Sequence, residues 1–265
     1  MPNNPVDEDP WKDLQKYSNA RLALGRAGDS IPTAEILRFA YAHAQARDAV
    51  HAALDIDAMQ STLESAGLTA LRVHSSAADR ATYLARPDLG RRLAQDSALA
   101  LQEYAAEQAL PPPRGYACDI ILIVADGLSA PAMARNVRPL ISEIVRRTPT
   151  DWTLGPVVIA EQARVALSDE IGEILGARMV VMLIGERPGL SSPDSLGMYL
   201  TWAPRRGCSD AQRNCISNVR PEGLSYGEAA RRLWWLCVEA RRLGASGIAL
   251  KDGSDLAGLP SDPLL

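Results

Sequence analysis

The pattern of apolar and polar residues divides the chain into two regions of different texture. In residues 31–110, apolar side chains recur at the spacing of a helix face, as at Ile36, Leu37, Ala40, Tyr41 and Ala44. This pattern predicts a mostly helical region with one short strand at residues 68–75, directly after a helix that stops at Gly67. A second long helix is expected from Asp88 towards Leu110.

From residue 119 onward, apolar runs alternate with amphipathic stretches. The runs predict buried strands at residues 119–127, 154–160 and 179–184. Ser129 is expected to cap a helix that starts near Pro131 and ends near Thr148, and Ser168 a second helix that stops at Gly176. Two successive βαβ units predict an α/β fold: a Rossmann-like parallel sheet with helices on both faces, preceded by the mostly helical N-terminal region.

Prolines separate these two regions. The segment PPPRG at residues 111–115 cannot continue a helix, because proline lacks the amide hydrogen and disfavours helical geometry in the residue before it. We therefore expect a boundary near Pro113 and three segments: a flexible N-terminal tail (1–20), a mostly helical region (21–113) and an α/β domain (114–265). Within the tail, apolar residues three apart also fit a short amphipathic docking helix, at Trp11, Leu14 and Tyr17.

Ligands of parallel, helix-covered sheets bind beyond the carboxyl ends of the strands. Three polar segments are expected at this edge: ADGLS (125–129), EQARV (161–165) and GERPG (185–189). Glu186 is thus a carboxylate that directly follows a buried strand. It either contacts a ligand, or pairs with Arg187 or a neighbouring basic side chain and closes a loop, and the residues alone leave both interpretations open.

The charge balance argues against two classes of partner. Lys and Arg number 28 against 32 Asp and Glu, so the formal net charge of -4 provides no overall positive field for nucleic acid or an anionic membrane. No uncharged apolar run approaches the ~18 residues of a membrane span, and MPNNPVDEDPW has neither the basic nor the apolar part of a secretory signal. We expect a cytoplasmic protein that binds neither nucleic acid nor membrane.

The residues that commonly form catalytic or metal sites do not assemble into a motif. The cysteines are dispersed and the histidines lie upstream, at Cys118, Cys208, Cys215, Cys237, His43, His51 and His74. This spacing matches no zinc site, so reduced structural thiols are expected, with exposed helix-face histidines at positions 43 and 51. The chain also lacks G-x-G-x-x-G, the P-loop motif and G-x-S-x-G. A stand-alone nucleotide-binding α/β enzyme and an assembly scaffold without ligand contacts remain as alternatives.

Several strings carry a resemblance to a known family. They occur in order along the chain: LGRAG (24–28), YLARPDLGRRL (83–93), ADGLS (125–129), DEIGEILGAR (169–178), IGERPGL (184–190), NCISNVRPEG (214–223) and ASGI (245–248). From about Arg21 to Lys251 the chain resembles the small, or light, subunit of ethanolamine ammonia-lyase. IGERPGL followed by CISN is a highly specific part of this match.

The resemblance implies an adenosylcobalamin-dependent lyase that converts ethanolamine to acetaldehyde and ammonia. In this family the large subunit, a barrel, holds ethanolamine and hosts the radical chemistry, while the small subunit closes over the cobalamin. The cofactor performs the difficult step and the protein positions it. We therefore expect no catalytic acid or base and no metal ligand in this chain. We also expect a partnership with the large (heavy) subunit in a hetero-oligomer with several copies of each.

The resemblance also implies three cobalamin contacts, at positions that match the family's motifs: Val165 in EQARV, Glu186 in IGERPGL and Cys215 in NCISN. Each is expected at or beyond the end of a strand, and hence in a common crevice. Glu186 would accept hydrogen bonds from amides or hydroxyls, and Val165 would cover apolar corrin or base surface. Cys215 would offer backbone polar groups and a small side chain rather than a thiolate.

Two features depart from patterns known among cobalamin proteins and in this family. No histidine lies in the D-x-H-x-x-G motif, so the cofactor's own dimethylbenzimidazole is expected to stay on cobalt. Relatives from enteric bacteria carry a longer N-terminal extension associated with packaging into a bacterial microcompartment, whereas the match here begins only near Arg21. A cytoplasmic location is expected, and encapsulation in a microcompartment stays open.

Overall fold

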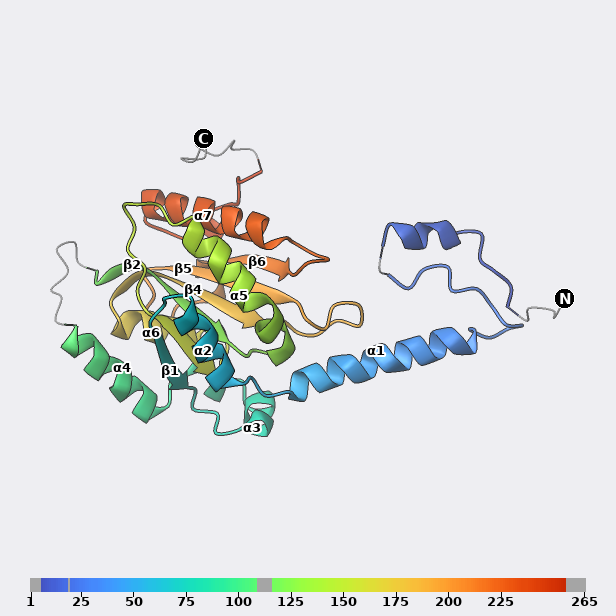
Figure 1. Cartoon of the computed structure of the whole chain (residues 1–265), viewed down its shortest axis with the longest axis horizontal. Coiled ribbons are helices and arrows are strands. Elements are labelled where there is room, and N and C mark those ends of the chain that lie inside the picture. The colour runs from blue at the N-terminus through green and yellow to red at the C-terminus, as the bar shows by residue number, and fades with distance from the viewer. Residues whose placement is uncertain (1–5, 19, 109–115, 256–265) are drawn as a thin grey trace.

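The fold is centred on a six-stranded sheet with the strand order β1-β3-β2-β4-β5-β6 (Figure 1). The computed structural model describes residues 6–18, 20–108 and 116–255. The strands are β1 (Ala70–His74), β2 (Cys118–Ala125), β3 (Val157–Glu161), β4 (Ala177–Gly185), β5 (Leu196–Trp202) and β6 (Arg213–Val219). The first four correspond to the strands that the apolar runs predict.

Most of the sheet is parallel. Strands β1, β3, β2 and β4 are parallel neighbours, whereas β5 runs antiparallel to β4, and β6 antiparallel to β5. The chain between β4 and β5 is a loop of residues 186–195 without a helix, so it returns directly along the neighbouring strand. The predicted α/β fold is confirmed, and the two C-terminal strands are an antiparallel addition that the apolar runs did not predict.

Helices cover both faces of the sheet, as predicted. The α-helices are α1 (Thr33–His51), α2 (Ile56–Ser65), α3 (Arg80–Ala85), α4 (Gln95–Glu107), α5 (Ala130–Arg146), α6 (Leu167–Ile174) and α7 (Tyr226–Leu243). Short 3-10 helices are η1 (Lys12–Lys16), η2 (Leu89–Arg91), η3 (Asp210–Gln212) and η4 (Gly247–Ala249). Helices α2, α5 and α7 contribute to the core on one face, while α4 and α6 contribute to the core on the other.

Strand β2 shows why the apolar runs are continuous. Alternate side chains of this strand enter the two cores, Ile120 and Leu122 on the α5 side, and Ile121 and Ile123 on the α6 side. A strand with both faces covered needs apolar residues at every position. The continuous run therefore encodes a central strand, which is where β2 lies in the sheet.

The two predicted caps have different outcomes. The Ser129 side chain accepts a hydrogen bond from the Ala132 N–H and caps α5 as predicted. The prediction that Ser168 caps α6 is wrong, because the helix begins earlier and its N-cap is Ala166. Ser168 lies inside α6, and its hydroxyl donates to the Val165 carbonyl over 2.7 Å. Gly176, with φ +63°, follows the helix end as predicted.

The helix expected from Asp88 begins later, at Gln95. Residues 89–91 form only a 3-10 turn, after which the chain is extended. The reason is tertiary: this extended stretch pairs with the end of β1, where the Ala94 N–H donates to the His74 carbonyl over 2.9 Å. The expected boundary near Pro113 lies outside the described residues.

Helix α1 extends away from the body of the molecule (Figure 1). The predicted helix is present, and His43 and His51 lie exposed on it as expected. Its larger apolar side chains are also exposed, however, with Leu37 64 % and Tyr41 65 % accessible. On this helix only Ala42 and Ala49 are buried. The apolar pattern that predicts α1 therefore does not contribute to the core of this chain.

The segment before α1 folds back on itself. Asp7 and Arg26 pair through their backbone groups, and η1 lies between them with Trp11 and Tyr17 exposed. None of the helices in the described residues is long and apolar enough to cross a membrane.

Candidate functional site

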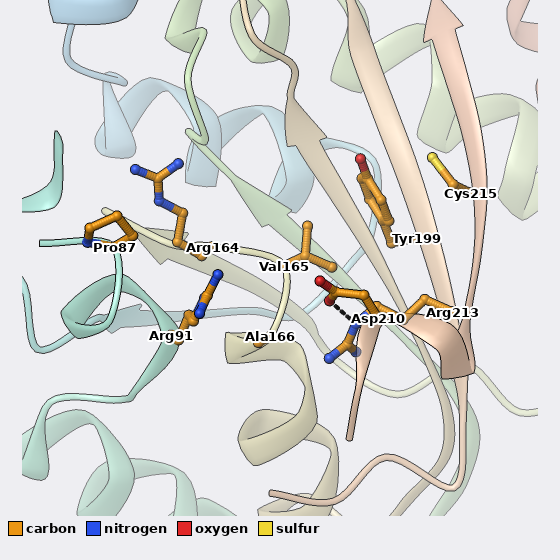
Figure 2. A pocket seen from close by; sticks show the side chains of 9 residues that line it. All are labelled: Pro87, Arg91, Arg164, Val165, Ala166, Tyr199, Asp210, Arg213 and Cys215. Carbon is orange, nitrogen blue, oxygen red and sulfur yellow. Dashed lines mark hydrogen bonds and ion pairs between the residues drawn. The ribbon is translucent and has the colours of Figure 1, made fainter. Parts of the chain in front are cut away.

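A pocket of about 310 Å³ opens on the α6 side of the sheet, over strands β5 and β6 (Figure 2). One wall comes from the η2 segment and the β3–α6 loop, and the other from β5, η3 and β6. Nine residues line it: Pro87, Arg91, Arg164, Val165, Ala166, Tyr199, Asp210, Arg213 and Cys215. The pocket therefore joins segments that are far apart in the sequence.

A buried carboxylate holds the β3–α6 loop in place. Asp126, directly after β2, accepts hydrogen bonds from the N–H groups of Gln162 and Ala163 over 3.1 and 3.2 Å, and from Gly127. It is also paired with Arg80 at 3.2 Å. Burial raises the pKa of Asp126, while Arg80 and the three N–H donors act against this rise. These contacts fix the loop that carries Val165.

Tyr83 also holds the β3–α6 loop in place. Its ring is fully buried, and its hydroxyl donates to the Ala163 carbonyl over 3.1 Å. The guanidinium groups of Arg80 and Arg164 lie over the ring, 4.8 and 4.1 Å from its centroid. Burial raises the pKa of Tyr83 to about 12, so the hydroxyl keeps its proton and remains a donor at neutral pH.

A buried ion pair joins helix α6 to strand β6. Asp169, in the first turn of α6, accepts two parallel hydrogen bonds from Arg213 over 2.6 and 2.7 Å. Arg213 also donates to the Thr201 hydroxyl and the Cys208 carbonyl, and contacts Asp210 at 3.3 Å. Burial raises the pKa of Asp169, and Arg213 acts in the opposite direction. The N–H donors of Arg213 are thus bonded within this chain, and its side chain forms part of the pocket lining.

Tyr199 and Cys215 form the opposite wall. They are directly paired across β5 and β6, and both project towards the pocket (Figure 2). Cys215 is exposed, and its sulfur lies 3.2 Å from the Ser217 hydroxyl. Burial raises the pKa of the Tyr199 phenol, and Cys215 and Glu186 add to the effect. The Tyr199 phenol therefore keeps its proton at neutral pH, and the phenol and the Cys215 thiol can each donate or accept a hydrogen bond.

Glu186 lies beside the pocket rather than in its lining. It directly follows β4, and its carboxylate accepts hydrogen bonds from the Ser195 hydroxyl and, over 3.3 to 3.4 Å, from the Asn218 N–H. A Cβ at Gly197 would come within 2.9 Å of the carboxylate and 3.2 Å of the Tyr199 ring, so Glu186 and Tyr199 are neighbours over β5. No ion pair joins Glu186 to Arg187, both of which are described.

The three sequence-predicted residues therefore lie in one region, but only two of them line the pocket. Val165 lies in the loop after β3 and Glu186 follows β4, as expected. Cys215 is the third residue of β6, and the expectation that it lies at or beyond a strand end is wrong. The pocket brings Val165 and Cys215 together, although fifty positions separate their numbers, and Glu186 adjoins it through Tyr199.

The three polar segments expected at the ligand edge have different roles. EQARV contributes Arg164 and Val165 to the pocket, and GERPG contributes Glu186 beside it. ADGLS does not line the pocket: its Asp126 fixes the β3 end, and its Gly127 lies against the backbone of Gly185. A Cβ at Gly127 would meet the Gly185 carbonyl oxygen at 2.3 Å, which explains this glycine without a ligand.

Seven further lining residues were not singled out by the sequence, and five of them are polar or charged. Arg164 lies inside EQARV and Arg91 inside YLARPDLGRRL, so both were quoted within family strings without a role of their own. Tyr199, Asp210 and Arg213 lie outside any quoted string. A local signal could not have found them, because their place in the pocket depends on β5 and β6.

The described residues offer no evident metal centre. No group of three or more His, Cys, Asp or Glu side chains among them is arranged to hold a metal ion. All four thiols are free, and the histidines lie on α1 and β1, away from the pocket lining. The donor set of the pocket consists of guanidinium, carboxylate, phenol and thiol groups, which suits an organic ligand with amides, hydroxyls or an anionic group.

Comparison with known proteins identifies the relatives of this chain. The family described as "Ethanolamine ammonia-lyase light chain (EutC)" matches residues 8–251. The chain belongs to this family. A relative in Azotobacter vinelandii named "Ethanolamine ammonia-lyase small subunit" is 54 % identical over 257 residues, covering 97 % of this chain and 93 % of the relative. Proteins of the same name in Pseudomonas fluorescens and Pseudomonas syringae pv. tomato are 52 % and 53 % identical over 264 and 261 residues. These matches cover 99 % and 98 % of this chain, and 94 % and 89 % of those relatives.

Membership of the light chain family agrees with the resemblance found in the sequence strings. The match extends through the N-terminal segment, α1, the sheet and the pocket. The light chain family is therefore defined over the whole fold and not over a single motif, and every residue of the pocket lining lies within the matched range.

Proposed function

We propose that this chain is the small subunit of an adenosylcobalamin-dependent ethanolamine ammonia-lyase, which converts ethanolamine to acetaldehyde and ammonia together with a large subunit. Val165, Glu186 and Cys215 contact the cobalamin. The observation that carries the proposal is that a chain of the light chain family brings Val165 and Cys215 into one pocket, with Glu186 beside it. These are the positions that the family resemblance selects from three separate motifs.

The chemistry of the pocket fits a corrinoid. Val165 and Ala166 offer an apolar surface, while the Tyr199 phenol and the nearby Glu186 carboxylate can bond the amide side chains that surround a corrin ring. Glu186 uses part of its capacity for Ser195 and Asn218, and a carboxylate has about four acceptor positions, so room remains for an external donor. When bound, the cofactor supplies the adenosyl radical that abstracts hydrogen from the substrate.

This chain binds and orients, and it does not transfer protons to the substrate. The carboxylates at the pocket are held in ion pairs and its phenol is neutral: Asp169 and Asp210 pair with Arg213, and burial raises the pKa of Tyr199. The histidines lie on α1 and β1, outside the pocket lining, so we expect none of them to bind cobalt in place of the cofactor's own dimethylbenzimidazole. Nitrogen hyperfine coupling from a labelled protein histidine at cobalt would contradict this last point.

The size of the pocket supports a site shared between two chains. A cavity of about 310 Å³ is at the lower end for a drug-sized ligand, and a cobalamin is larger than such ligands. The pocket therefore takes one edge of the cofactor, and the large subunit encloses the rest. Several copies of each subunit assemble into the enzyme.

Helix α1 supports the need for a partner. Ile36, Leu37, Phe39 and Tyr41 are all exposed, and at 3.6 residues per turn they point in several directions around the helix axis. Several large apolar side chains exposed on one segment mark an interaction surface. The large subunit covers this projecting arm, which makes α1 part of the contact between the two subunits.

Reconstitution tests the proposal directly. The purified chain alone should show no ethanolamine turnover, and turnover should appear when the large subunit and adenosylcobalamin are both added. Turnover by this chain alone would support a stand-alone enzyme instead. Val165→Asp places a carboxylate against the corrin and should lower turnover. Normal assembly and full turnover with this variant would contradict the proposed ligand contact and favour an assembly scaffold without ligand contacts. Val158→Ala, in the sheet core, serves as the control for folding.

A further inference from the structure

The pocket contains two arginines that this chain does not neutralise. Arg91 and Arg164 both line the pocket, and neither has a carboxylate within 4.0 Å among the described residues. The Arg91 side chain is exposed and makes no hydrogen bond with the described residues. Arg164 donates one bond, over 3.1 Å, to the Tyr83 carbonyl, and its Nε is buried without an acceptor. Most of the ten N–H donors of the two groups are thus unused.

Backbone contacts hold these two arginines on the same wall. The Arg164 N–H donates to the Gly90 carbonyl over 2.8 Å. A Cβ at Gly90 would come within 2.9 Å of the Arg164 side chain, so only glycine allows the two segments to approach this closely. Arg91 follows Gly90 directly, which places it beside Arg164, and Figure 2 shows both on one side of Val165 with Tyr199 and Cys215 on the other.

Two other positive features nearby are already satisfied. Arg213 is paired with Asp169 and Asp210 and is almost fully buried. The first N–H groups of α6 donate to the carbonyls of Arg164 and Val165 in the preceding loop, so the helix terminus offers little to a ligand. An anion that enters the pocket is therefore attracted by Arg91 and Arg164 specifically.

We propose that Arg91 and Arg164 bind the phosphate of the cobalamin nucleotide loop. This inference rests on the proposed function, because it names the part of the cofactor that meets this wall. A cobalamin carries neutral amides around the ring and a single phosphate, which is its only anionic group at neutral pH. Paired guanidinium groups are the side chains best suited to a phosphate, since each can donate two parallel hydrogen bonds.

Three corrinoids isolate the phosphate in a binding experiment on the complex with the large subunit. Adenosylcobalamin has the phosphate and the base, adenosylcobinamide phosphate has the phosphate without the base, and adenosylcobinamide has neither. Dissociation constants are measured from the change in the visible spectrum. The variants are Arg91→Gln and Arg164→Gln, and the matched control is Arg92→Gln, an adjacent exposed arginine outside the pocket lining.

Arg91→Gln should weaken the first two corrinoids by about tenfold and leave adenosylcobinamide unchanged. Arg164→Gln should show the same selectivity, and Arg164→Lys should restore part of the loss because it keeps the charge. Arg92→Gln should change none of the three. Arg91 is exposed, so its variant is not expected to disturb the fold even if Arg164→Gln does.

Two kinds of result would overturn the phosphate subsite while the proposed function stands. One is a change in affinity that does not depend on the phosphate, whether an equal loss for all three corrinoids or no loss for any. The other is weaker assembly with the large subunit at unchanged corrinoid affinity, which would assign the arginines to carboxylates of the partner. If the unaltered complex binds none of the three corrinoids, the proposed function itself fails.

Discussion

Removing the Glu186 carboxylate should have two separable effects, one on stability and one on cofactor affinity. The structure explains the first, because Glu186 accepts hydrogen bonds from the Ser195 hydroxyl and the Asn218 N–H and so joins the ends of β4, β5 and β6. In Glu186→Ala the buried Ser195 hydroxyl loses its acceptor, which costs about 1–3 kcal/mol of unfolding free energy. The Asn218 N–H is exposed and can bond water, so it adds little.

The second effect comes from the acceptor positions that Glu186 has left. If they bind cofactor amides or hydroxyls, each charge-assisted bond contributes roughly 1.5–3 kcal/mol, and Glu186→Ala weakens cobalamin binding about tenfold to a hundredfold. Glu186→Gln keeps the size and one carbonyl oxygen, so its losses in stability and in affinity should both be smaller. Turnover at saturating cofactor should largely survive, because this residue holds an edge of the cofactor and not the reacting carbon.

Ser195→Ala is the control that separates the two roles. It removes the hydroxyl donor and leaves the Glu186 carboxylate free to bind the cofactor. The melting temperature and the cobalamin dissociation constant are measured for all three variants in the reconstituted complex. Ser195→Ala should lower the melting temperature, by about 2–4 °C per kcal/mol lost, with little change in affinity. Unchanged affinity in Glu186→Ala, together with a fall in melting temperature like that of Ser195→Ala, would show that Glu186 only joins the strand ends.

Three further outcomes are expected. Leu37→Glu, on the exposed face of α1, should weaken assembly with the large subunit without lowering the melting temperature of the chain, and unchanged assembly in analytical ultracentrifugation would place the contact elsewhere. All four cysteines should react with a thiol reagent after denaturation without reductant; in the native chain the exposed Cys215 should react first, ahead of Cys118, whose pKa burial raises to about 11, and of the buried Cys237. Gly127→Ala should lower stability by a few kcal/mol, because its Cβ meets the Gly185 carbonyl at φ +56°; a melting temperature like that of the parent would contradict this contact.

The parallel part of the fold could be predicted because its signal is local. Each central strand is covered on both faces, so it is a continuous apolar run, and each crossover helix has its own cap or stop, such as Ser129 for α5 and Gly176 after α6. The late start of α4 shows where local signals fail. The residues after Asp88 have helical propensity, but only a 3-10 turn forms at 89–91, and backbone pairing with the end of β1 then holds residues 92–94 extended.

The candidate site was only partly predictable for a related reason. Val165 and Glu186 follow predicted strands, so their edge of the sheet could be argued from the pattern alone. Cys215 depends on β6, an edge strand in which only every third residue is buried, so it matches neither the alternating nor the continuous apolar pattern of a strand. Arg91 and Arg213 line one pocket only because the η2 segment, the β3–α6 loop and β6 lie side by side, and no spacing in the sequence predicts that arrangement.

The position of the pocket also explains why this α/β fold lacks the phosphate motifs of nucleotide-binding enzymes. In a doubly wound sheet the usual crevice lies where neighbouring strands send their connections to opposite faces. Here that point lies between β2, which leads to α5, and β3, which leads to α6. It is filled by Asp126, which accepts three backbone N–H groups and pairs with Arg80.

A nucleotide phosphate at that crevice would compete with a buried carboxylate for the same N–H donors, and the repulsion between two buried anions costs several kcal/mol. The crevice is therefore occupied by structural contacts, in which the N–H groups of Gln162 and Ala163 donate to Asp126 and fix the loop of Val165. The groups available to a ligand lie instead in the pocket over β5 and β6, where Arg91 and Arg164 have no carboxylate partner among the described residues. This displacement argues against the stand-alone nucleotide enzyme and favours a ligand large enough to reach from the open face to a second chain.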